Sequence, residues 1–152
     1  MHTVIKTFPE LTAAELYEIL RLREAVFIVE QNCPYPEADG RDYGAVHYYY
    51  CGDDGRVSAY LRLYAKEGEP GTVQIGRVVT GIRGAGLGRK ILHEGIRYAI
   101  DSMNAERLYL EAQVYAVGFY EKEGFEVSSE PFLEDGIPHV QMRRESIVSS
   151  PR

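Results

Sequence analysis

The chain has 152 residues, of which 45% are hydrophobic and 26% are charged, a balance typical of one globular domain with a single core. The formal net charge of −6 argues against a nucleic-acid-binding protein, because neutralising phosphates requires a basic surface. An acidic surface favours cationic small partners, although much of this charge is also explained as solvated surface.

Targeting and metal signals are absent from the sequence pattern. The N-terminal segment MHTVIKTFPE has no basic region followed by an apolar run, and no apolar stretch approaches the roughly 18 residues of a membrane span. Cys33 and Cys51 have no CxxC spacing and no nearby histidine pair. We therefore expect a cytoplasmic protein with two reduced thiols, no metal and no membrane contact.

The first elements expected are a strand and a helix. The apolar run Val4–Phe8 predicts a short strand. Thr12 and Glu15 have the S/T-x-x-E spacing of a capping box, so a helix should begin there and continue towards Glu30. The polar loop Asn32–Gly44 follows, and a loop of this length is typical of a functional site, so we interpret it as a wall of a substrate site.

A hairpin and a third strand come next. The runs His47–Cys51 and Val57–Tyr64 are rich in β-forming residues and flank an Asp-Gly step at Gly55, which predicts an antiparallel hairpin. Val73–Thr80 is a third run of this kind. Gly76 inside it indicates a bulge, or a place where another backbone comes close.

The C-terminal half alternates helices and strands. Spaced apolar residues from Leu92 to Met103 predict a helix with one buried stripe. The elements expected after it are a strand at 107–113, a helix at 116–123, and strands at 125–128 and 139–143. This order predicts parallel pairing of the strands at 73–80 and 107–113 within a mixed sheet, that is, an α/β (α+β) fold.

A glycine-rich segment at 83–90 joins a strand to a helix, where unpaired amides and the helix dipole attract an anion. Arg83, Arg89 and Lys90 add positive charge, so a ligand carrying phosphate is expected. The segment lacks the G-K-[ST] ending of a P-loop, and Arg89 occupies the last glycine position of the dinucleotide fingerprint. A purely structural glycine turn is the alternative.

Two motifs in order resemble those of the GNAT superfamily of N-acetyltransferases. Arg83, Gly86 and Gly88 match its coenzyme A loop, [QR]-x-x-G-x-[GA], and residues 116–125 look like its second motif, A-x-x-x-Y-x-K-x-G-F. The segments 22–35 and 135–139 further resemble the ElaA-like subgroup. The resemblance implies one N-acetyltransferase domain over residues 1–152. It also implies a twisted, mostly antiparallel sheet of about six or seven strands with about four helices, whose central parallel pair splays apart.

The resemblance further implies acetyl-CoA as co-substrate, without a metal. It assigns contacts with this molecule to the strand before the loop, to the loop and to two later residues: Val78, Val79, Thr80, Arg83, Gly84, Ala85, Gly86, Leu87, Gly88, Arg89, Gln113 and Tyr120. An N–H near Val78 would polarise the thioester carbonyl. Tyr120 falls on the position that protonates the departing thiolate. Gln113 stands where the family usually has Asn.

The general base is less defined by the sequence. Tyr109, Glu111 and Gln113 share one face of a strand that we expect to be buried, so burial should raise the pKa of Glu111. Glu30 and His139 are rival bases or substrate contacts, and Asp39 is a further substrate contact. Acidic residues lie on two segments that we expect to flank the acceptor side. They are either an anionic funnel that attracts an ammonium group or solvated charges of surface loops. These residues are Glu30, Glu37, Asp39, Asp42, Glu134 and Asp135.

The function expected is transfer of an acetyl group to the amine of a small molecule or peptide in a ternary complex. The alternatives are a catalytically silent sensor that binds acyl-CoA and a protein-interaction domain. Members of such families are commonly dimers, so a homodimer is consistent with the resemblance, although no segment marks an interface.

Overall fold

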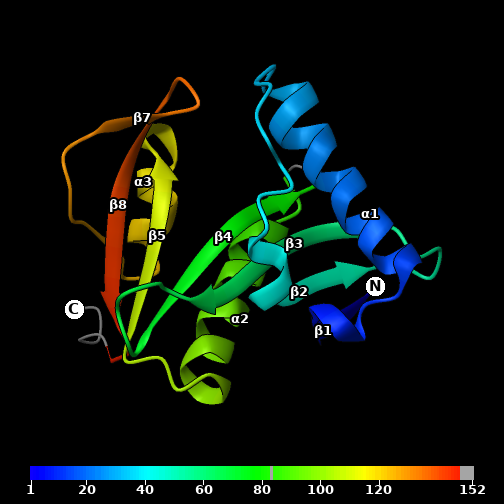
Figure 1. The fold of residues 1–152 in the computed structure, drawn as a ribbon, viewed down its shortest axis with the longest axis horizontal. Coiled ribbons are helices and arrows are strands. Elements are labelled where there is room, and N and C mark those ends of the chain that lie inside the picture. The colour runs from blue at the N-terminus through cyan, green and yellow to red at the C-terminus, as the bar shows by residue number, and fades with distance from the viewer. Residues whose placement is uncertain (83, 148–152) are drawn as a thin grey trace.

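The computed structural model describes residues 1–82 and 84–147, which form one mixed sheet of eight strands covered by helices (Figure 1). The strands are β1 (His2–Thr7), β2 (Val46–Cys51), β3 (Val57–Ala65), β4 (Thr72–Thr80), β5 (Arg107–Gln113), β6 (Glu126–Val127), β7 (Phe132–Glu134) and β8 (Ile137–Glu145). Their order is β1-β2-β3-β4-β5-β8-β6, and β7 pairs with β8. All pairs are antiparallel except β4 and β5.

Helices pack on opposite faces of this sheet. They are α1 (Ala13–Arg23), α2 (Leu87–Ser102) and α3 (Val117–Glu121), with the short segments η1 (Phe8–Glu10), η2 (Glu24–Glu30), η3 (Arg41–Gly44) and η4 (Val114–Ala116). Alternation along β2 divides the core, because Tyr48 and Tyr50 join the cluster under α2 whereas Tyr49 joins the cluster under α1. Gly95 allows α2 to approach β3 closely, since a Cβ there would lie 2.8 Å from Leu61 Cδ2.

The first helix begins as predicted and ends differently. The Thr12 hydroxyl accepts a hydrogen bond from the Glu15 amide, and the Glu15 carboxylate accepts one from the Thr12 amide, which completes the capping box. The α-helix stops at Arg23, and the chain continues as the π-helix η2 to Glu30. A π-helical turn contains an extra residue, and such turns are frequent at functional sites.

The parallel strands β4 and β5 are in register over only three pairs, from Thr72 with Arg107 to Gln74 with Tyr109. Beyond these pairs the two strands separate, as Figure 1 shows towards the top of the view. A bulge in β4 accompanies the separation, because its register with β3 shifts between Tyr60 and Arg62. Arg77, in this bulge, has a positive φ of 51°, which is uncommon for a residue other than glycine. The predicted mixed sheet with a splayed parallel pair is confirmed.

Other sequence predictions differ from the structure in detail. The sheet described here has eight strands where six or seven were expected, because β7 is a three-residue strand without a periodic signal. Three α-helices lie within the described residues, where the resemblance implied about four. Cys33 and Cys51 are buried free thiols. Within the described residues, every helix is too short or too polar to cross a lipid bilayer.

Candidate active site

A cleft of about 840 Å³ lies where β4 separates from β5. One wall comes from η2 and the loop that follows it, and the other comes from β5, α3 and the β7–β8 hairpin. Many of the residues predicted for the site line this cleft: Asp39, Val78, Val79, Thr80, Gly88, Glu111, Gln113, Tyr120 and His139.

The glycine loop forms the turn into α2. Gly84 and Gly86 have φ angles of 79° and 73°, a left-handed conformation that disfavours other residues. Gly86 is the N-cap of α2, and neither a capping side chain nor an acidic residue satisfies the first turn, so its amides can serve an anion. Gly88 faces the cleft, where a Cβ would lie 3.6 Å from both Phe119 Cζ and Thr80 Cγ2.

Three other loop positions lie outside the cleft lining. Ala85 is exposed, and Leu87 is buried with its side chain in the core cluster under α2. Arg89 lines a separate hollow of about 340 Å³ at the start of α2. Arg83 lies outside the described residues, so its predicted role in the coenzyme A loop is not addressed by the structure.

The β4 residues beside the loop expose a strand edge to the cleft. The pairing of β4 with β5 ends at Gln74, so the backbone of Val78, Val79 and Thr80 has no partner on β5. Val79 packs into the cluster under α1, whereas Val78 packs against the cluster under α2. An extended molecule in the cleft could therefore pair with this edge as an added strand does.

Tyr120 projects from α3 into the same cleft. Its ring centroid lies 5.1 Å from that of Phe119 and 6.3 Å from that of Phe125, so packing holds the ring in place. Burial, together with the nearby Tyr115, raises the pKa of the Tyr120 hydroxyl well above its usual value. Among the described residues, none forms a hydrogen bond with this hydroxyl, which thus holds its proton at neutral pH and can donate it to a ligand.

His139 presents one ring nitrogen to the cleft. Its Nδ1–H donates a hydrogen bond of 2.7 Å to the carbonyl of Ile137, and because a carbonyl only accepts, Nδ1 must carry the proton. The other ring nitrogen, Nε2, lies 3.7 Å from the Glu134 carboxylate. The ring stacks on Phe132, which fixes its plane. His139 can therefore accept a proton at Nε2.

Two carboxylates, Glu134 and Glu111, line the cleft together with His139. Burial raises the pKa of Glu134, the neighbouring charge of Glu111 raises it further, and His139 opposes the shift. Glu111 accepts a hydrogen bond of 2.7 Å from the Tyr109 hydroxyl. The expectation that Glu111 is buried is wrong: the strands have separated at this level, so the side chain is exposed to the cleft, while Tyr109 beneath it is buried.

Gln113 and Glu30 occupy different positions relative to the cleft. Gln113 Nε2 donates a long hydrogen bond of 3.4 Å to Gln31 Oε1, which joins β5 to the end of η2. A second long hydrogen bond also joins the two walls of the cleft: the Cys33 thiol donates to the carbonyl oxygen of Asp135, 3.4 Å away. Glu30 is exposed and is not among the residues that line the cleft, so the structure does not bring it together with His139.

Neither an anionic funnel nor solvated loop charge describes Glu37, Asp39 and Asp42, because arginines neutralise these carboxylates. Arg23 is fully buried and binds Glu37 and Asp42. Arg62 donates hydrogen bonds to both Asp39 and Asp42, and its two terminal nitrogens lie 2.9 and 2.5 Å from the carboxylate oxygens of Asp39. Arg77 forms ion pairs with Glu37 and Asp39. Burial alone would raise the pKa of Asp39, but the hydrogen bonds and charge of Arg62, together with the Arg41 amide and Arg77, lower it to about 2.

Sequence reasoning did not identify this ion-pair network or the position of Glu134 beside His139. A signal was available for the arginines, because Arg23 and Arg62 interrupt apolar segments, Leu22–Phe27 and Tyr60–Tyr64, at positions the periodicity marks as buried. A charge at such a position must be paired. No comparable signal marks Glu134, which reaches His139 only through the β7–β8 hairpin. Within the part of the chain that is described, no group of three or more potential metal ligands occurs.

Solved structures with the same arrangement define the class of protein. An acyl-CoA N-acyltransferase from Pseudomonas aeruginosa has a TM-score of 0.87 and 39% identity, over 95% of this chain and 99% of that one. Escherichia coli ElaA has a TM-score of 0.87 and 34% identity, over 95% and 99% of the two chains. The fold is therefore that of the N-acyltransferases.

The chain belongs to the acetyltransferase (GNAT) domain family, whose model matches residues 27–146. Its relatives include the UPF0039 protein C11D3.02c of Schizosaccharomyces pombe, which is 40% identical over 93% of this chain and 95% of its own length. The protein ElaA of Escherichia coli is 36% identical over 91% of this chain and 92% of its own length, in agreement with the predicted subgroup. Members of this family use acetyl-CoA or another acyl-CoA.

Proposed function

We propose that the protein is an N-acetyltransferase that transfers the acetyl group of acetyl-CoA to a primary amine by direct attack in a ternary complex. The observation that carries this proposal is the separation of β4 from β5 next to the glycine turn. It places an open strand edge, the hydroxyl of the partly buried Tyr120 and the cluster around His139 on one cleft. Direct transfer requires all of these groups to reach the two substrates at once.

The residues of the cleft fit a coenzyme A thioester. The amides of Gly84–Gly88 and the uncapped start of α2 suit a pyrophosphate, with Ala85, Leu87 and Arg89 contributing through this turn. The edge at Val78, Val79 and Thr80 suits the amides of a pantetheine arm, and Gln113 lies across from it. When bound, acetyl-CoA supplies the activated acetyl group. The N–H near Val78 is the proposed donor to its carbonyl oxygen.

Tyr120 is the proposed general acid. Burial keeps its hydroxyl protonated through the neutral range, which an acid must be before it can deliver a proton. Its ring is packed against aromatic neighbours, so the hydroxyl is held in one direction. Tyr120 thus supplies the proton that the departing sulfur requires.

Glu111 and His139 are the proposed proton acceptors for the amine. His139 Nε2 carries the lone pair because Nδ1–H is bound to Ile137, and Glu134 lies 3.7 Å away to stabilise the imidazolium. Glu111 is exposed to the cleft on the same side. An ammonium group that enters here meets the carboxylates first and then loses its proton.

Two measurements test this function. Binding of acetyl-CoA at about 100 times its Kd should stabilise the protein by about 2.7 kcal/mol, seen as a rise in Tm. Release of free thiol from acetyl-CoA on addition of a panel of amines should then identify an acceptor. Stabilisation without thiol release from any amine would favour a silent acyl-CoA sensor, and absence of both would favour an interaction domain.

Because Cys33 and Cys51 are both free thiols, we further propose that the reaction takes place in the cytoplasm.

A further inference from the structure

The two walls of the cleft differ in charge. The wall made by β5 and the β7–β8 hairpin presents carboxylates, with Glu111, Glu134 and Asp135 all in the lining. On the opposite wall, the carboxylates of residues 37–42 are already engaged by Arg23, Arg62 and Arg77. These ion pairs leave the described residues of the second wall without an unpaired carboxylate, and Arg41 adds a guanidinium group to its lining. A molecule with one positive and one negative group would match both walls.

A niche for the negative group lies above Gly76. Gly76 is directly opposite Arg62 across β3 and β4, and a Cβ on it would lie 3.6 Å from Arg62 Nε and 3.9 Å from the Tyr64 hydroxyl. Gly76 does not have a positive φ, so the backbone does not require glycine there. The absent side chain instead leaves space on the cleft side of β4, bounded by two hydrogen-bond donors.

Both donors lack partners within residues 1–82 and 84–147. Arg62 is 2% exposed, and its two terminal nitrogens bind Asp39 and Asp42, but Nε–H is buried with no acceptor. The Tyr64 hydroxyl has no hydrogen-bond partner among the described residues either, and Tyr64 is 8% exposed. A buried donor without an acceptor is unfavourable, and this applies to Arg62 Nε; the Tyr64 hydroxyl is not fully buried and is a second donor at the edge of the niche. An oxygen atom seated above Gly76 would satisfy both groups.

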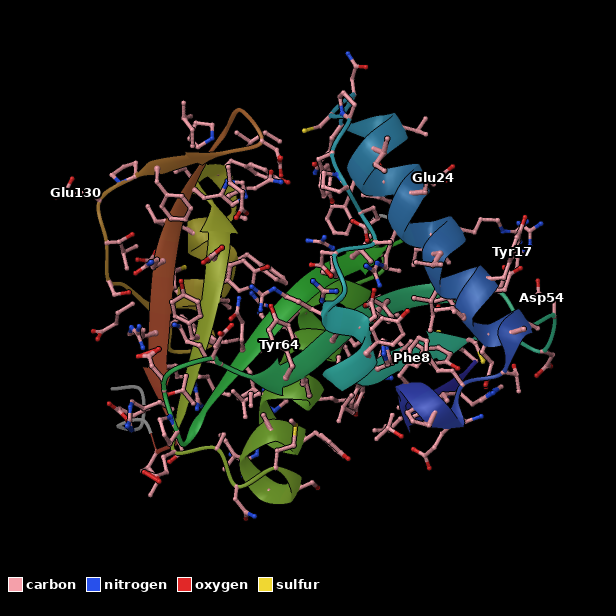
Figure 2. All side chains as sticks on the ribbon, in the orientation of Figure 1. Phe8, Tyr17, Glu24, Asp54, Tyr64 and Glu130 are labelled. Atoms are coloured by element: carbon pink, nitrogen blue, oxygen red, sulfur yellow. The ribbon has the colours of Figure 1, made fainter. Side chains whose placement is uncertain are left out.

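Arg41 supplies a third group to this niche. Its guanidinium carbon lies 5.6 Å from the centroid of the Tyr64 ring, and Arg62 lies 5.4 Å from the same centroid. Arg41 lines the cleft, and no carboxylate in the described part of the chain forms an ion pair with it. In the view of Figure 2, Tyr64 lies between β5 and η3, the turn that carries Arg41. A planar guanidinium placed in this way suits a carboxylate.

We propose that the acceptor carries a carboxylate as well as its amine, and that Arg41, Arg62 and Tyr64 bind this carboxylate above Gly76 while the amine faces Glu111 and His139. This inference rests on the proposed function. The last paired residues are Gln74 on β4 and Tyr109 on β5. Gly76 and Glu111 lie two residues further along these strands, where β4 and β5 are no longer paired. Their separation exceeds the roughly 4.8 Å between paired strands. The acceptor class is therefore amino acids whose two charged groups are far enough apart to reach both walls.

The test uses the full chain, saturated with coenzyme A, and a series of linear ω-amino acids from glycine to 6-aminohexanoate, each compared with its primary amide. Titration calorimetry should show at least one acid binding about 10- to 100-fold more tightly than its amide, as expected for hydrogen bonds to a charged group. In Gly76→Ala and Arg41→Gln, the ratio of acid to amide affinity should fall close to one. The alanine Cβ would make only ordinary van der Waals contacts, so the fold should persist.

Matched controls are Gly44→Ala, where a Cβ meets nothing within 4 Å, and Arg56→Gln on the β2–β3 turn, which is outside the cleft lining. Both should keep the wild-type ratio. Equal binding of acids and amides, a ratio that survives in Gly76→Ala, or no binding by any acid would each overturn the proposal. Acids that bind without thiol release from acetyl-CoA would support the niche and count against the transferase. Thiol release with amides as readily as with acids would support the transferase and count against the niche.

Discussion

Replacing Tyr120 with phenylalanine removes one hydroxyl group from the cleft and leaves the ring in place. The ring contacts with Phe119 and Phe125 do not involve the hydroxyl, and no described residue hydrogen-bonds it. We therefore expect the free energy of unfolding to change by less than about 1 kcal/mol, the worth of an ordinary hydrogen bond. Affinity for acetyl-CoA should be nearly unchanged.

Turnover by Tyr120→Phe should fall much further. A positioned general acid typically contributes about 10²- to 10⁴-fold, so we expect a loss of at least tenfold in kcat. Because burial holds the pKa of Tyr120 above its usual value, the wild type keeps this proton throughout the neutral range, and the deficit of the variant should persist from about pH 6 to pH 9.

The assay is thiol release at saturating acetyl-CoA, accompanied by calorimetry for acetyl-CoA binding and by denaturant unfolding. The matched control is Tyr17→Phe, which removes the same group from a residue that is 66% exposed on α1 and lies outside the cleft lining. That variant should turn over like the wild type. Wild-type rates in Tyr120→Phe, or an equal loss in both variants, would refute the role of Tyr120 as the acid.

Three further changes test the glycine turn, the ion-pair network and the carboxylates. Gly86→Ala forces a side chain into a left-handed conformation and should weaken acetyl-CoA binding about tenfold in calorimetry, because the amides of the turn would move. Arg23→Leu leaves Glu37 and Asp42 without their buried partner and should lower the free energy of unfolding by about 3–5 kcal/mol in urea. Glu134 must be ionised to stabilise the imidazolium of His139, and Glu111→Gln removes a negative charge that raises the pKa of Glu134, so the acidic limb of kcat/KM should move to lower pH.

Controls for these variants lie outside the cleft. Gly55→Ala has the same left-handed strain, with φ of 82°, in the β2–β3 turn, and should lower stability without weakening acetyl-CoA binding. Arg21→Leu removes an exposed ion pair with Glu18 and should change stability by less than about 1 kcal/mol. Glu126→Gln should leave the pH profile of kcat/KM unmoved. If a control matches its test variant, the corresponding site assignment is incorrect.

The local elements of this protein follow from local sequence. Thr12 and Glu15 specify the start of α1 because each satisfies an amide of the other's backbone, an interaction confined to four residues. The run Arg107–Gln113 is the strand β5 with the predicted bounds. Gly84 and Gly86 have left-handed angles, a conformation that glycine adopts at little steric cost. The motifs at 83–88 and 116–125 identified the family, as the match over residues 27–146 confirms.

Tertiary structure decided which charges meet. The alternation of residues along β5 predicted that Glu111 is buried, but the separation of β4 from β5 exposes its side chain. Alternation along one strand does not show whether the adjacent strand continues to pair with it. The sequence left the acidic residues of the 32–44 loop as either a funnel or solvated charge, yet Arg23 and Arg62, distant in the chain, neutralise Asp42 and Asp39.

The sequence by itself determined the elements, the glycine turn and the family, because hydrogen bonding within a few residues and side-chain periodicity suffice for these. Only the folded chain brings Glu134 to His139 and directs Arg62 Nε towards the space above Gly76. These contacts join residues on different strands, and their geometry depends on strand register and on the bulge in β4. The arrangement of charged groups in the cleft therefore depends on strand pairing rather than on any local pattern.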